Sequence, residues 1–175
     1  MQKLIESLEH RTLFASYTAS TVSQLIAAIN SANSSGAADT ITLAAGATFS
    51  LTAVNNSTTG ATGLPQIAGG GGLTILGGAA TIERSGAAGT PVFRLFDVAA
   101  NGSLALTNLT LQGGVGVAAS YFFAQGQATG GAILNQGTLS LDHVTIQNNT
   151  AQGFAGATEV GSYAPRTGGD GYRSL

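Results

Sequence analysis

Acidic side chains are the groups of this chain that could do acid–base or metal chemistry, and they are sparse. Between Thr12 and Pro165 they are Asp39, Glu83, Asp97, Asp142 and Glu159. A glycosidase needs two carboxylates flanking one bond, and a calcium-assisted lyase needs clustered carboxylates with a base that abstracts a proton. No two of these acids share a position in the repeat described below. The sequence therefore predicts no catalytic residues, no metal site and no cofactor.

One stretch gathers charges of both signs and is a candidate contact site for a glycan or partner. Its members are Glu83, Arg84, Arg94 and Asp97. They could bind a saccharide, or they could form exposed ion pairs that contribute about 0–1 kcal/mol. We expect Asp97 to point outward because it adjoins the inward residue Val98. His143 is expected to be a solvated turn residue, because one unpartnered histidine supports neither a triad nor a metal site.

A short aromatic run, Tyr121, Phe122 and Phe123, is the second candidate contact site for a glycan or partner. Aromatic rings can stack on sugar rings, and a cluster of this kind can also anchor the loop that carries it. Both interpretations place these residues on a loop between two repeats.

The elements that must position these residues are short strands in a repeat. Gly102–Gly114 returns almost position for position at Gly137–Asn149, 35 residues later. Apolar residues alternate within each copy, which indicates strands with one buried face. The alternation then slips by one residue at Thr107-Asn108, and at Asp142-His143 in the later copy. A corner at that point lets both halves face one core, and corners in a short repeat are typical of a β-solenoid.

The composition agrees with one solenoid domain. Of the 175 residues, 43% are hydrophobic and only 8% are charged, well below the ~25% of ordinary domains. The formal net charge of −2 argues against nucleic acid as a partner. No run approaches the ~18 apolar residues of a membrane span. The absence of cysteine excludes a disulfide framework.

We divide the chain into a segment over 1–19, a helix over 20–36, solenoid rungs over 37–150 and a Gly-rich tail over 151–175. Thr21 and Gln24 fit a capping box at the start of a helix over Thr21–Asn33, which would cover the open end of the core. The tail is interpreted as a truncated next rung, and the chain as the amino-terminal fragment of a longer solenoid whose continuation would be its partner.

Four rungs are expected from the spacing of the apolar triplets. The first contains Ile41–Leu43 and Phe49–Leu51. The other three are Leu64–Ile67, Leu73–Ile75 and Ala80–Ile82; Leu95–Val98, Leu104–Leu106 and Leu109–Leu111; and Ala132–Leu134, Leu139–Leu141 and Val144–Ile146. The alternative fold is an antiparallel sandwich, which the repeat and the corner disfavour.

These motifs resemble a known family. Gly130–Ile133 matches the GGAI block of the right-handed parallel β-helix proteins related to the polymorphic outer-membrane proteins, and Ile146–Asn149 matches their FxxN block with Ile for Phe. Residues 25–41 resemble the CSLREA-type segment that opens many such bacterial proteins, without its Cys, Arg and Glu. Leu8–Phe14 resembles the LEPR-type motif of surface proteins of planctomycete-like bacteria, and 1–19 is interpreted as a sorting segment.

The resemblance implies a right-handed, pectate-lyase-like parallel β-helix in a secreted or surface-displayed bacterial protein, often an adhesin. The expected function is a structural or interaction module, adhesin-like or stalk-like, with glycans or cell-surface proteins as partners. The alternative is the amino-terminal part of a polysaccharide lyase or glycoside hydrolase, because the same fold hosts these enzymes.

Overall fold

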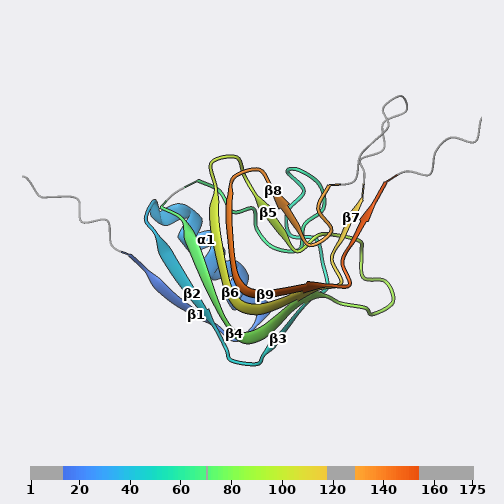
Figure 1. The fold of residues 1–175 in the computed structure, drawn as a ribbon, viewed down its shortest axis with the longest axis horizontal. Coiled ribbons are helices and arrows are strands. Elements are labelled where there is room, and N and C mark those ends of the chain that lie inside the picture. The colour runs from blue at the N-terminus through green and yellow to red at the C-terminus, as the bar shows by residue number, and fades with distance from the viewer. Residues whose placement is uncertain (1–13, 70, 118–128, 154–175) are drawn as a thin grey trace, which may run out of the picture.

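The computed structural model describes residues 14–69, 71–117 and 129–153, and these form a parallel β-solenoid with one helix (Figure 1). The elements in chain order are β1 (Ser16–Ala19), α1 (Val22–Ser35), β2 (Asp39–Leu43), β3 (Thr48–Leu51), β4 (Leu73–Arg84), β5 (Phe96–Val98), β6 (Ser103–Gln112), β7 (Val115–Val117), β8 (Ile133–Asn135), β9 (Thr138–Gln147) and β10 (Thr150–Gln152).

The main sheet confirms the register that the repeat predicts. Its strands follow the order β1-β2-β4-β6-β9, with β3 paired to the second half of β4. Leu104 of β6 lies beside Leu139 of β9, and Leu111 lies beside Ile146. Every strand pair in the described residues is parallel, which excludes the antiparallel sandwich.

Each long strand turns a corner where the alternation slips. Leu106 and Leu109 lie on opposite sides of this corner in β6, yet both are buried in the same core. The residue at the corner, Asn108, has a φ of 52°, and its counterpart His143 in β9 has the same value. A left-handed residue reverses the pleat once. Figure 1 shows β4, β6 and β9 side by side, each following the same bend.

Two shorter parallel pairs, β5–β8 and β7–β10, complete the turns. Strands β5 and β7 come from one turn, and β8 and β10 come from the next. The space between these strands and the main sheet is filled by one cluster of buried apolar side chains, which includes Ile41, Phe49, Ile75, Phe93 and Phe96. Burial of these side chains is the main favourable term for the fold.

Helix α1 forms where the sequence predicts it. Thr21 is its N-cap, and the Thr21 hydroxyl oxygen accepts a hydrogen bond from the Gln24 backbone N–H at 3.2 Å. Gln24 completes the capping box, because its Oε1 accepts from the Ser20 N–H at 2.8 Å. The helix packs against β1 and β2, and its buried residues, including Leu25 and Ile29, belong to the solenoid core.

The sheet differs from the expected rungs in three places. It begins earlier, because Ser16–Ala19 adds strand β1 beside β2. Leu64–Ile67 is not a strand, and Ile67 instead forms a single bridge to Val98. Strand β7 lies between the third and the fourth expected rungs, where we expected a loop. The solenoid consequently makes about three turns rather than four.

Candidate functional site

Asp97 lies on the expected face of β5, but the expectation that this face is exposed to solvent is wrong. Its side chain is 0% exposed, and Arg94 is also buried. The segment between Asn55 and Gly63 folds over β5, so the side of this strand that faces away from the core is covered by a loop rather than by water. Thr62 forms a bridge to Arg94 within this cover. Alternation predicted the face on which Asp97 lies, but could not predict that a distant loop covers that face.

Asp97 holds this loop through its carboxylate. Its Oδ2 accepts hydrogen bonds from Thr59 Oγ1 at 2.6 Å, from Gln66 Nε2 at 2.9 Å and from Asn56 Nδ2 at 3.3 Å. A buried carboxylate requires such donors, because removing the charge from water is costly. The other oxygen, Oδ1, is buried and has no partner among the described residues.

Arg94 supports the same loop from the other side. Its Nη1 donates to the Thr59 carbonyl at 3.2 Å, while its Nε is buried and without a partner in the described part of the chain. Burial lowers the pKa of Arg94, and the charge of Asp97 offsets part of that change. These two residues therefore form an interior polar cluster rather than an exposed ion pair.

Glu83 and Arg84 are half-buried, and each contacts the next turn of the solenoid. Gln112 Nε2 donates to Glu83 Oε2 at 2.7 Å, and Gln147 Nε2 donates to Gln112 Oε1 at 3.0 Å. Arg84 Nε donates to the Gly113 carbonyl at 2.9 Å. The four predicted charged residues therefore do not form one patch, because two lie inside and two join hydrogen bonds between neighbouring turns.

The outward faces of the main sheet carry two columns of small side chains, most of them hydroxyls. Strand pairing aligns one column of threonines on the second half of the bent strands: Thr48, Thr81, Thr110 and Thr145. The first half carries a second column, which consists of Ser16, Thr40, Thr74, Ala105 and Ser140. Neighbouring strands of a sheet lie about 4.8 Å apart, so each column is a regular row of small polar groups.

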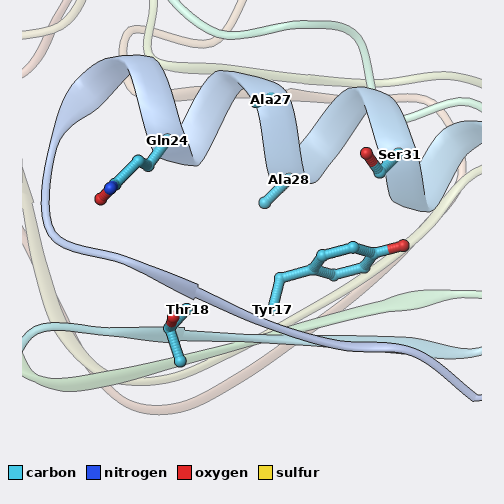
Figure 2. A pocket seen from close by; sticks show the side chains of 6 residues that line it. All are labelled: Tyr17, Thr18, Gln24, Ala27, Ala28 and Ser31. Atoms are coloured by element: carbon cyan, nitrogen blue, oxygen red, sulfur yellow. The ribbon is translucent and has the colours of Figure 1, made fainter.

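A groove runs between β1 and α1 at the first edge of the sheet (Figure 2). It is lined by Tyr17, Thr18, Gln24, Ala27, Ala28 and Ser31. The ring of Tyr17 lies below the helix and faces Ala28 and Ser31. A ring beside an amide and a hydroxyl suits a neutral polar ligand, because the lining contains neither a carboxylate nor an amine. Sequence reasoning missed this groove because β1 lies outside the repeat.

The last described rung is open. The residues of β6 that face the core are buried, whereas their partners in β9 are Leu139, Leu141, Val144 and Ile146, all partly or largely exposed. Leu141 is 44% exposed and Ile146 is 47% exposed. At the corner of this rung, His143 lies in solvent as predicted, but it has a partner: its Nδ1 lies 2.6 Å from Asp142 Oδ1.

The aromatic run Tyr121–Phe123 lies outside the described residues. In the ranges that the structure describes, no three His, Asp or Glu side chains are placed to hold a metal ion, and no helix is long and apolar enough to cross a membrane. Comparison with protein-family models, curated proteins and solved structures finds no match for this chain.

Proposed function

We propose that this chain is a structural and interaction module of a secreted or surface-displayed bacterial protein, adhesin-like or stalk-like, that binds neutral glycans or neighbouring surface proteins. The observation that carries the proposal is the pair of outward columns, in which eight of the nine residues are serine or threonine at a regular spacing along the stack. A solenoid supplies length and a long repeating face rather than a deep pocket.

Such a face binds through many weak hydrogen bonds. Each neutral hydrogen bond contributes about 0.5–1.5 kcal/mol net, so useful affinity requires several contacts at once. The threonine column offers these contacts in a row on one face of the sheet. Because the threonine column carries no charge, binding should depend little on salt.

The proposal includes a right-handed coil, whose first end is covered by α1. Parallel strands joined by crossovers follow the right-handed rule in nearly all sheets. Leu25 and Ile29 of the helix lie in the same core cluster as the strand residues, which fits a cover over apolar side chains that would otherwise meet water at β1. The Tyr121–Phe123 run stays a candidate anchor for a glycan.

Glycan-array binding by the full 175-residue chain tests this function. Thr110→Lys places a long charged side chain in the middle of the threonine column, and we expect binding to fall at least tenfold while the circular dichroism spectrum is unchanged. Ser23→Lys is the matched control, because Ser23 is exposed on α1, away from the column. Unchanged binding by the Thr110 variant, or binding lost at 0.5 M salt, would contradict the proposal.

The alternative is part of a polysaccharide lyase or hydrolase, which needs an accessible carboxylate beside the scissile bond. In the described solenoid, Asp39 and Asp97 are buried, and Glu83 is hydrogen-bonded to Gln112. Asp142 is exposed, but the residue beside it on β6 is Thr107 rather than a second carboxylate. We expect no unsaturated or shortened products from pectin or alginate. Products that disappear in Glu83→Gln would establish the enzyme instead.

A further inference from the structure

The open rung has a twofold pattern. Strand β9 bends between Asp142 and His143, and the core-facing positions lie symmetrically about this midpoint: Leu141 and Val144 are the nearer pair, and Leu139 and Ile146 the farther pair. The ends of β9, Thr138 and Gln147, are also equally far from the midpoint. The strand therefore presents the same order of inward and outward side chains when it is read in either direction.

The symmetry extends to the rest of the rung. Strand β8 ends three residues before β9 begins, and β10 begins three residues after β9 ends, and both strands are three residues long. A rotation of 180° about an axis through the corner, perpendicular to the stack, exchanges the two halves of β9. It also keeps every core-facing side chain on the core side.

We propose that the open rung binds a second copy of this chain, with β9 of one copy paired antiparallel to β9 of the other about this twofold axis. Leu141 then lies opposite Val144 of the second copy, and Leu139 lies opposite Ile146. The exposed apolar side chains of both copies enter one continuous core, and the free backbone groups along both edges gain hydrogen bonds.

The polar side chains at the corner complement each other in this arrangement. Asp142 of each copy lies opposite His143 of the other, so the contact between the copies alternates a carboxylate with an imidazole. The two residues already lie 2.6 Å apart within one chain. Pairing therefore brings no like charges face to face, which is a requirement for a self-complementary interface.

A second copy fits this edge better head-to-head than head-to-tail. The opposite edge of the sheet is β1 on the first half of the bend and β3, one turn further in, on the second half. Each is four residues long against the ten of β9, and α1 packs beside β1. Pairing of β9 with β1 would leave more than half of β9 and its apolar side chains without a partner. Pairing of β9 with β9 matches two strands of equal length and equal pattern.

The first experiment measures the mass of the full chain in solution by sedimentation velocity across a range of concentrations. We expect a dimer, and we expect Ile146→Lys to shift its dissociation constant at least a hundredfold, because the charge would enter the shared core. Ser23→Lys is the control, since Ser23 is exposed on α1, away from β9. A chain that stays monomeric at all concentrations overturns the proposal. This holds whether or not hydrogen exchange shows that another segment protects the β9 amides.

The second experiment tests the register by disulfide cross-linking, because the chain has no cysteine of its own. Ser140 lies opposite Thr145 of the second copy, where Cα atoms of paired antiparallel residues are about 4.5–5.5 Å apart, within reach of a disulfide. An equimolar mixture of Ser140→Cys and Thr145→Cys should cross-link between the two variants. Neither variant should cross-link alone. In a dimer of one variant, the cysteines of the two copies would lie about 15 Å apart along the paired strands.

A dimer that fails to cross-link in the mixture, or cross-links equally in the single variants, would show another pairing and overturn the proposal. The two proposals fail separately. A monomer that binds glycans leaves the proposed function standing, whereas a cross-linked dimer without glycan binding refutes only that function.

Discussion

Replacement of Asp97 is the most direct test of the interior polar cluster. In Asp97→Ala, three donors lose their acceptor: Thr59 Oγ1, Gln66 Nε2 and Asn56 Nδ2. Each unpaired buried donor costs about 1–3 kcal/mol. All three side chains are only half-buried, so water can replace part of what is lost. We therefore expect the free energy of unfolding to fall by about 3–5 kcal/mol, as for other broken buried charged groups.

Asp97→Asn separates the acceptor from the charge. The amide oxygen can occupy the place of Oδ2 and keep all three hydrogen bonds, while the amide nitrogen takes the place of Oδ1, which has no partner in the described residues. Two losses remain, the attraction to Arg94 and an amide N–H group buried without an acceptor, so we expect about 1–3 kcal/mol. Asn56→Ala is the graded control, since it removes only the longest of the three bonds and should cost about 1 kcal/mol.

Urea unfolding followed by circular dichroism measures these differences, and hydrogen exchange at the Asn56 and Thr62 amides reports on the loop. The loop amides should exchange faster in Asp97→Ala than in Asp97→Asn. If the Asn variant were as unstable as the Ala variant, the attraction between charges would outweigh the acceptor and the reasoning would be wrong. A cost below 1 kcal/mol for Asp97→Ala would show that the loop does not depend on the carboxylate.

Three further pairs of substitutions test the solenoid itself by the same unfolding assay, at concentrations where the chain is monomeric. Leu106→Ala should cost about 3 kcal/mol and Leu141→Ala about 1 kcal/mol, because Leu106 is 1% exposed and Leu141 is 44% exposed; equal costs would mean that the last rung is covered. Gly102→Ala should cost about 1–3 kcal/mol, because its Cβ would lie 2.4 Å from a backbone oxygen of the preceding turn. Gly86→Ala has open space and should be neutral, which makes it the matched control. Asn108→Ala should cost about 1–2 kcal/mol at a φ of 52°, whereas Asn108→Gly should cost less, and equal stability of the two would rule out a strained corner.

The repeat predicted the main sheet because each of its features has a local cause. Alternation fixed the inward side chains of β6, and the slip at Asn108 required a corner, which the left-handed backbone there supplies. The 35-residue return fixed the register of β6 against β9. Strand β1 could not be found in this way, because its four residues have no counterpart in the repeat and form a strand only by pairing with β2.

The candidate site was harder to predict because it depends on what covers a side chain. Alternation gives the direction of Asp97, yet its environment is decided by a loop some forty positions earlier in the sequence. The same limit applied to Leu141, which points toward the core but has no turn above it in the described residues. The outward threonine column was present in the sequence, but its meaning appears only when the strands are stacked.

In the proposed dimer, the outward columns of the two copies join into longer rows. The twofold axis exchanges the two halves of the bent strands, so the threonine column of one copy continues into the first-half column of the other. Thr145 would lie opposite Ser140 of the second copy, followed by Ala105, Thr74 and Thr40. Pairing would therefore double the length of each hydroxyl row without adding charge. Because weak contacts in one row add through effective concentration, a dimer would hold a repeating glycan more tightly than two separate copies.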